Sequence, residues 1–209
     1  MQKFFDDDFI ILLLYVDDIL IVGGNVSRID KLKKQLSKSF SMKDLGPTKK
    51  ILGIRIERDK VSKKLYMSHE QYIEKVLEIS SPLANHFKLS SRHNPSIDKE
   101  KEDMRKVLYA SIVGSLMYVM VCTRPDIAYA VGVVSRFLSN PGRLQWETVK
   151  WIMRYLRDTS KLKLTFGSGK PILVGYTDSD MAVDVDNRRS TSDYLMTFLG
   201  GVVSWQSRV

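Results

Sequence analysis

The spacing of apolar residues near the start of the chain predicts a hairpin followed by a helix. Two apolar runs, residues 9–16 and 19–22, lie on either side of Asp17 and Asp18. Runs of this length predict two buried strands, with the acidic pair at the turn between them. After two glycines, apolar residues recur at helical spacing over 29–40 with lysines between them, which predicts an amphipathic basic helix.

The next part of the pattern predicts a second hairpin, a helix and a polar connection. Residues 51–57 and 64–67 are candidate strands joined by a polar turn. Ser68, followed three residues later by a glutamine, is a capping-box start for a helix that ends near residue 79. The sequence over 80–101 is polar and contains two prolines, so we expect a linker or extended loop there.

The remaining pattern predicts helices and then strands. The expected helices cover 102–121, 125–140 and 141–158. Proline opens the second and third of these, and it fits a first helical turn because its missing N–H would be unpaired there anyway. The candidate strands cover 162–166, 171–178, 193–199 and 202–206. The fold class is therefore α+β, in four segments: 1–80, 81–101, 102–160 and 161–209.

The last expected helix shows a clear apolar stripe. Its members recur at helical spacing, which predicts packing in a core: Trp146, Val149, Ile152, Met153 and Leu156. This arrangement leaves Lys150, Arg154 and Arg157 pointing outward.

Asp17 and Asp18 are hard to explain as packing. Burying an unpaired carboxylate is costly, and two adjacent carboxylates repel each other. One interpretation is therefore a cation site. The other is a plain solvent-facing turn, although hairpin turns favour Asn-Gly or Asp-Gly.

Charge and composition narrow the class of partner. The chain has 33 Lys and Arg against 24 Asp and Glu, a net charge of +9. This balance favours nucleic acid as partner, with a basic surface that binds nothing in particular as the alternative. Cys122 is the single cysteine, so an intramolecular disulfide is excluded and a reducing, intracellular compartment is expected. The apolar run 9–22 is too short and too charged to span a bilayer, and Asp6 to Asp8 do not suit a signal peptide, so no membrane role is expected.

A family resemblance rests on several motifs. Tyr15-Val16-Asp17-Asp18, between apolar strands and ahead of Gly23-Gly24, resembles the palm signature of reverse transcriptases. The longer match is similar to plant copia-type retrotransposon Pol polyproteins. It continues through Leu45-Gly46, 51–54, 109–118, Thr123-Arg124-Pro125-Asp126-Ile127, 176–180, 189–192 and 204–208. The resemblance covers essentially the whole chain and implies a partial palm, a helical thumb or connection region, and the truncated start of a ribonuclease H-like sheet.

The resemblance also implies site residues and partners. Asp17 and Asp18 match two of the three palm carboxylates that hold two Mg²⁺ (or Mn²⁺) ions for nucleotidyl transfer. Tyr15 would pack beside the primer end or the incoming dNTP, with a core aromatic as the alternative. Asp178, which ends a strand over 172–177 that we expect to be buried, matches the first acidic residue of the ribonuclease H fold. The implied partners are an RNA template, a DNA primer and an RNA–DNA hybrid.

Both implied sites are incomplete in this sequence. The third palm carboxylate belongs to an earlier strand, and Asp8 is no substitute because an extended strand would hold it about 30 Å from Asp17. The remaining nuclease carboxylates follow Val209 in the family. We therefore expect the chain to be inactive alone. The rival interpretations are a non-catalytic nucleic-acid-binding remnant and a relic without a biochemical role.

The sequence also departs from the family pattern. Met181 replaces a usual tryptophan, and Val183 and Asp193 replace usual glycines. Loss of glycine removes access to positive φ, so local strain or relaxed selection is expected. The nearby acidic residues Asp180, Asp184 and Asp186 fit a solvated turn.

Basic residues near the acidic pair are candidates for phosphate contact. Lys31, Lys33, Lys34 and Lys38, with Lys49, Lys50 and Arg55, could line a groove that follows a nucleic-acid backbone. The alternative for the helical lysines is a solvated helix face. The three histidines, His69, His86 and His93, lack metal-ligand spacing and are expected to be surface or capping residues.

Overall fold

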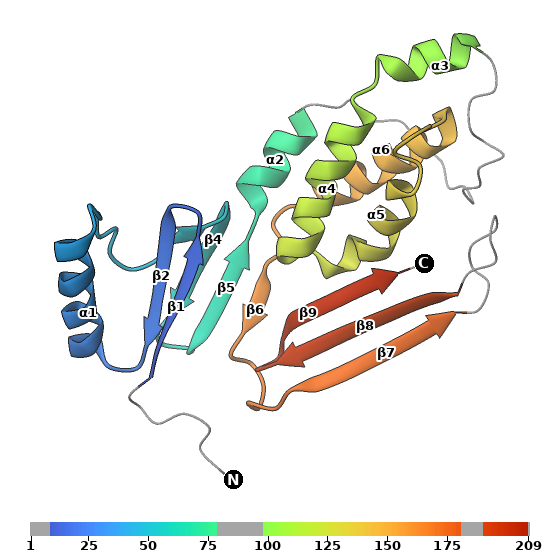
Figure 1. Ribbon diagram of the computed structural model, residues 1–209. Coiled ribbons are helices and arrows are strands. Elements are labelled where there is room, and N and C mark those ends of the chain that lie inside the picture. Colours follow the sequence, from blue (N-terminus) through green and yellow to red (C-terminus); the bar gives the residue numbers. More distant parts are fainter. Residues whose placement is uncertain (1–8, 79–97, 181–189, 209) are drawn as a thin grey trace. The chain divides into compact units, whose positions relative to one another are not determined.

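The computed structural model describes residues 9–78, 98–180 and 190–208. The chain divides into two compact units, residues 1–49 and 50–209, and each is treated by itself. Helices and antiparallel sheets both occur, as the expected α+β class requires (Figure 1). None of the described helices combines the length and the apolar composition that crossing a bilayer requires.

The first unit is a hairpin followed by a helix. Strands β1 (Ile10–Tyr15) and β2 (Asp18–Gly23) pair antiparallel, and helix α1 (Val26–Ser39) follows. The side chain of Asn25 accepts a hydrogen bond from the Arg28 backbone N–H at 3.3 Å, which caps the helix. The predicted hairpin and amphipathic helix are confirmed.

The expectation that the two strands are buried is wrong. Leu13 is 54% exposed and Leu14 is 71% exposed, and nearly all of β1 is open to solvent. A strand is buried on both faces only when other layers cover both sides of its sheet. The described part of this unit offers a two-stranded sheet and one helix, so the apolar side chains lack covering layers.

The second unit contains a four-stranded antiparallel sheet. Its order is β3-β4-β5-β6, with bounds Lys50–Ile51, Ile54–Asp59, Lys64–Ser68 and Leu164–Phe166. The predicted second hairpin is confirmed as β4–β5. At its turn the Asp59 carboxylate accepts hydrogen bonds from the backbone N–H groups of Val61 and Ser62.

The edge strand β6 lies in an unexpected place. It comes from the segment 161–209, but it pairs with β5 and not with the strands that follow it in sequence. Local pattern identifies a strand but does not choose its partner, because pairing is decided by long-range contacts. The four-segment division stays a prediction, with this strand joined to the sheet of the first segment.

Helices form the interior of the second unit. Their bounds are α2 Glu70–Glu78, α3 Asp98–Arg105, α4 Tyr109–Thr123, α5 Ala128–Ser135 and α6 Arg143–Asp158, with the 3-10 turn η2 at Pro125–Ile127. The helical core is defined here as the buried residues of α2, α4, η2, α5 and α6: Ile73, Tyr109, Ile112, Val113, Leu116, Val119, Ile127, Val131, Val134, Val149, Ile152, Met153 and Leu156. The Tyr109 hydroxyl donates to the Val134 carbonyl at 2.8 Å, which joins α4 to the end of α5.

Three helix boundaries differ from expectation. The single helix expected over 102–121 is two helices, α3 and α4, separated at 106–108. Seven of the eight residues of α3 are charged, whereas α4 has no charged residue and six buried ones. The two helices therefore suit surroundings of different polarity. Residues 98–101 are helical and not linker, while the rest of the expected linker, 80–97, lies outside the described residues. The helix expected to end near 140 ends at Ser135.

The expected apolar stripe of the last helix is confirmed. One residue next to the stripe, Lys150, differs from the prediction. Val149, Ile152, Met153 and Leu156 are buried in α6, and Trp146 is partly buried against the helical core. Lys150, expected to point outward, is only 9% exposed. Its ammonium group lies 2.9 Å from Glu147, one helical turn earlier, and this ion pair allows the charge to be buried.

A three-stranded sheet completes the second unit. Its order is β7-β8-β9, with bounds Val174–Asp180, Thr191–Phe198 and Gly201–Arg208. Leu199 and Gly200 both have positive φ and form the tight turn between β8 and β9. The Trp205 indole N–H donates to the Met120 carbonyl at 3.1 Å, and this bond links β9 to α4.

Candidate functional site

The acidic pair lies at the tip of the β1–β2 hairpin. Tyr15 pairs with Asp18 in the register, so Val16 and Asp17 form the two-residue turn, one residue earlier than predicted. Val16 has a φ of 50° and is 86% exposed. Positive φ is unfavourable for a β-branched residue, so the backbone next to the acidic pair is strained. Asp17 and Asp18 are both exposed.

The exposed carboxylates fit a cation as ligands. Among residues 9–49, neither Asp17 nor Asp18 has a side-chain hydrogen bond or ion pair, so their oxygen atoms are available. Carboxylate oxygens are the donors that Mg²⁺ and Mn²⁺ prefer. No group of three or more potential metal-ligating side chains occurs within the described parts of the chain. Two carboxylates are therefore what the described structure supplies here.

Tyr15 is placed beside the acidic pair and is not a core aromatic. It is 55% exposed and lies directly opposite Asp18 across the hairpin. Residues paired in this way project from the same face of a sheet. The Tyr15 ring is therefore available next to Asp18 for contact with a ligand.

Helix α1 presents its lysines in two groups. Lys31, Lys34 and Lys38 are exposed, and their spacing of three and four places them along one side of the helix. Lys33 instead forms an ion pair with Asp44 at 3.1 Å. The Gly46 backbone N–H and then Lys33 hold the pKa of Asp44 below its usual value. Lys50 and Arg55 belong to the second unit, so a groove shared with α1 stays a prediction.

Asp178 lies within strand β7, opposite another carboxylate. Asp178 pairs with Asp193 of β8, and both line a cavity of about 200 Å³ together with Tyr129 and Thr191. The Ser179 backbone N–H donates to Asp178 at 2.9 Å.

Three expectations about this region need correction. Strand β7 continues to Asp180, so Asp178 does not end it and Asp180 is not in a turn. The strand is exposed and not buried. Asp193 sits in a regular strand without positive φ, so no strain arises from the loss of glycine there. Met181, Val183, Asp184 and Asp186 lie outside the described residues.

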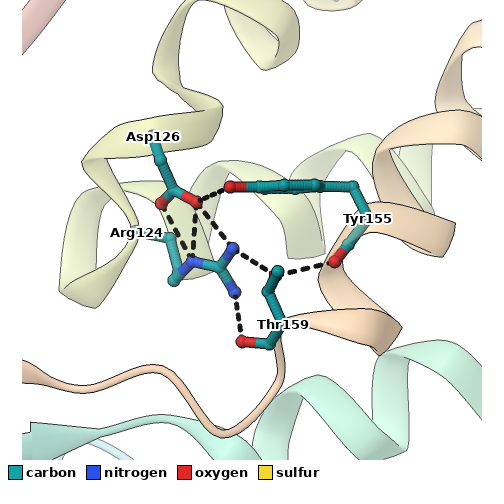
Figure 2. Close-up of polar contacts among 4 residues, drawn as sticks. All are labelled: Arg124, Asp126, Tyr155 and Thr159. Carbon is teal, nitrogen blue, oxygen red and sulfur yellow. Dashed lines mark hydrogen bonds and ion pairs between the residues drawn. The ribbon is translucent and has the colours of Figure 1, made fainter.

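The Arg124 side chain forms a polar network that sequence reasoning did not identify. Figure 2 shows its guanidinium between Asp126, Tyr155 and Thr159. It is 2% exposed, and its donors reach Asp126 at 2.6 Å, the Thr159 hydroxyl at 2.6 Å and the Thr159 carbonyl at 3.2 Å. The Tyr155 hydroxyl donates to Asp126 at 2.8 Å. The network therefore ties the η2 turn to the end of α6.

The contacts of this network shift the pKa values of Asp126 and Tyr155. Burial acts to raise the pKa of Asp126, but hydrogen bonds from Arg124 and Tyr155 outweigh it and hold that pKa below its usual value. The hydrogen bond to Asp126 raises the pKa of Tyr155. The only sequence signal was the run Thr123-Arg124-Pro125-Asp126, which carries the family resemblance but states no role.

His69 is buried, against the expectation of a surface position. It is 1% exposed, and its ring lies near Tyr72 and Tyr118, with centroids 5.1 and 5.4 Å away. It directly precedes α2, and its carbonyl accepts hydrogen bonds from the first turn of that helix. Burial lowers the pKa of His69. The predicted capping residue Ser68 accepts from the Glu70 N–H at 3.3 Å. His86 and His93 lie outside the described residues.

Comparisons with known proteins identify the family. Residues 1–90 match the family model described as reverse transcriptase (RNA-dependent DNA polymerase). The chain is 59% identical over 217 residues to a retrovirus-related Pol polyprotein from a tobacco (Nicotiana tabacum) transposon, covering 100% of this chain and 16% of that protein.

Two further relatives match more of their own length. An uncharacterised mitochondrial protein of Arabidopsis thaliana is 36% identical over 94% of this chain and 82% of its own length. A protein of Plasmopara viticola named as a secreted RxLR effector is 51% identical over 50% of this chain and 75% of its own length. No solved structure gives a significant match. The reverse transcriptase model and these relatives together show that the chain belongs to the reverse transcriptase family of retrotransposon Pol polyproteins.

Proposed function

We propose that this chain supplies part of the active site of a copia-type retrotransposon reverse transcriptase. Asp17 and Asp18 would be two of the carboxylates that hold divalent ions, and Tyr15 would contact the primer end or the incoming dNTP. The observation that carries the proposal is the hairpin tip, where both carboxylates are exposed and without side-chain partners among residues 9–49. The chain spans 16% of the tobacco polyprotein, so the activity of the whole protein is part of the proposal.

The residues of the chain would have distinct tasks. Asp17 and Asp18 would bind the ions through carboxylate oxygens. When bound, such ions stabilise the attacking and leaving oxygens of an in-line displacement. Lys31, Lys34 and Lys38 would bind phosphates of the primer–template from one side of α1. The positive φ of Val16 supports this assignment, since strained backbone is common where side chains must be held for function.

The proposal includes inactivity of the chain by itself. The hairpin brings together two carboxylates, whereas the family mechanism uses three. Asp178 would be the first carboxylate of a partial ribonuclease H-like sheet, which would likewise need further acidic residues. A segment carrying the third palm carboxylate would have to be supplied with this chain for polymerisation to occur.

Primer extension in a chimaera tests the proposal. The 59% identity allows this chain to replace the matching stretch of the tobacco polyprotein. We expect the chimaera to extend a DNA primer on an RNA template with Mg²⁺ and dNTPs, and Asp17→Asn or Asp18→Asn to reduce extension at least 100-fold. Asp30→Asn, an exposed aspartate of α1, is the matched control and should leave extension unchanged. Full extension by either hairpin variant would contradict the assignment.

The lysines of α1 also support a second candidate, a non-catalytic nucleic-acid-binding remnant. Three exposed lysines on one side of a helix and a net charge of +9 need no catalytic site to bind phosphates. Binding of a labelled hybrid should then weaken with salt, and each lysine changed to alanine should lower the slope of log K against log salt by about 0.7–0.9. Salt-dependent binding by a chimaera that never extends primers would favour this candidate over the first.

A further inference from the structure

We infer that Asp193, together with Asp178 and Thr191, forms a divalent-cation site on one face of the β7–β8 hairpin. The ligand class is a hard ion such as Mg²⁺, Mn²⁺ or Ca²⁺. The inference deepens the role proposed for Asp178 and rests on it for that one residue. Asp193 and Thr191 are assigned as ligands from the structure alone.

The strand register brings the two carboxylates together. Asp178 and Asp193 are direct partners across the antiparallel pair β7–β8. Side chains paired in this way project from the same face, with Cβ atoms about 4.5–5.5 Å apart. Like charges placed directly opposite each other destabilise a sheet. A cation bound between the two carboxylates would attract both and offset their repulsion.

Thr191 provides independent support for a ligand at this place. It lies two residues before Asp193 on β8, so both side chains project from one face of the strand. Thr191 is 4% exposed, and its hydroxyl has no hydrogen-bond partner among the described residues. Buried polar atoms without partners are costly, and each calls for a specific explanation.

The same cavity contains a second buried oxygen of this kind. One carboxylate oxygen of Asp193 is also buried and without a hydrogen-bond partner among the described residues. Thr191 and Asp193 both line the cavity of about 200 Å³ that Asp178 and Tyr129 complete. That volume has room for an ion with bound waters. One cation in this cavity would give the buried oxygens of Thr191 and Asp193 a partner and would also contact the Asp178 carboxylate.

The donor set decides the class of ion. Every polar side-chain atom that lines the cavity is an oxygen, from two carboxylates, a hydroxyl and a phenol. Oxygen donors select hard cations, whereas zinc and copper favour nitrogen or sulfur ligands. Mn²⁺ is the most convenient probe because it is a hard ion with a direct spectroscopic signal.

Mn²⁺ binding to the full chain, followed by electron paramagnetic resonance, is the first measurement. We expect saturable binding that Mg²⁺ displaces. Asp193→Asn should weaken it at least tenfold and Thr191→Val severalfold. Asp158→Asn is the matched control, since Asp158 is an exposed carboxylate of the same unit, and it should leave this binding unchanged. An Asp17→Asn, Asp18→Asn background removes any contribution from the hairpin of the first unit.

Thermal unfolding is a second measurement. Repulsion alone predicts that the variant is more stable in every buffer, whereas ion binding predicts that the order of melting temperatures reverses with Mn²⁺. In EDTA, Asp193→Asn should raise the melting temperature because it removes one of two facing charges. With saturating Mn²⁺ the order should reverse, because the unmodified chain gains the bound ion. A variant that stays more stable at every Mn²⁺ concentration would overturn the inference.

The variants also separate this inference from the role proposed for Asp178. Loss of binding in both Asp178→Asn and Asp193→Asn supports the three-residue site. Loss in Asp178→Asn with full binding in Asp193→Asn and Thr191→Val overturns the inference and leaves the role of Asp178 intact. Absence of Mn²⁺ binding to the hairpin-variant background overturns the inference as well, since the three residues would then hold no ion.

Discussion

The β1–β2 hairpin and the helical core use apolar residues in opposite ways. In the hairpin, Leu13 and Leu14 are more than half exposed, whereas Leu116 and Leu156 of the core are fully buried. The hairpin nevertheless has a continuous apolar sequence, while α6 has an amphipathic one. Apolar content alone therefore does not tell which residues stabilise the chain. Burial depends on whether another layer covers the strand or helix.

The two regions also place their charged groups differently. The carboxylates of the hairpin tip are exposed and without side-chain partners among residues 9–49, which suits a ligand site. The charges next to the core, Arg124 and Lys150, are buried and paired within the protein. Unpaired exposed charge is available for binding, whereas paired buried charge fixes structure.

The largest difference should come from the same truncation made in both regions. Leu116→Ala should lower the free energy of unfolding by about 2–5 kcal/mol, because it removes a fully buried side chain and leaves a cavity. Leu14→Ala should cost less than about 0.5 kcal/mol, since Leu14 is 71% exposed. Urea unfolding of the two variants measures both values. Equal losses would mean that the hairpin is covered in solution.

A smaller loss is expected when the Arg124 network is weakened. Arg124→Lys keeps the charge but removes the planar fork that reaches Asp126 and Thr159 together. We expect a loss of about 2–3 kcal/mol, within the range for leaving buried polar groups without partners. The Phe variant of Tyr155, which removes only the hydroxyl bond to Asp126, is the milder comparison. An Arg124→Lys variant as stable as the parent in urea would show that the network is dispensable.

The stability of the chain should depend on pH through two groups that titrate in different pH ranges, His69 and Asp126. Burial lowers the pKa of His69 below its ordinary 6.5, so the unfolded chain binds a proton that the folded one resists. Stability should therefore fall as the pH drops below about 6.5 toward the folded pKa, and His69→Phe should abolish that part of the loss. Urea unfolding between pH 7.5 and 5 measures it. A profile identical in parent and variant would contradict the buried position of His69.

Protonation of Asp126 should also lower the stability of the chain as the pH falls, but at a lower pH than protonation of His69. Its folded pKa lies below the ordinary 3.8, so its contribution is present above about 3.8 and is lost as the pH falls through the folded value. Asp126→Asn should flatten this acid limb. An unchanged limb would place the titrating group elsewhere.

The smallest effect is expected at the strained turn of the hairpin. Val16→Gly relieves a φ of 50° without removing a buried contact, because Val16 is 86% exposed. We expect a gain of at most about 1 kcal/mol in local stability, partly offset by the greater freedom of glycine in the unfolded chain. Amide hydrogen exchange over 10–23 measures it locally. Faster exchange in the variant would contradict the expected gain.

Sequence reasoning was most successful where local pattern is enough. The two hairpins, the basic helix and the stripe of α6 were predicted because periodicity and turn residues act over short distances. It was least successful at helix ends and at buried polar groups. The break at 106–108 and the burial of Lys150 were both missed. The burial of His69 and the Arg124 network depend on contacts between segments distant in sequence.

The sequence by itself determined the family, the α+β class and the position of Asp17 and Asp18 at a hairpin tip. These follow from short motifs and from the alternation of apolar and polar residues. Only the tertiary structure decided which apolar strands are covered, that β6 joins β5, and that Asp193 faces Asp178 beside Thr191. The physical reason is that burial and strand pairing are properties of surfaces brought together by folding, and no local pattern specifies the partner.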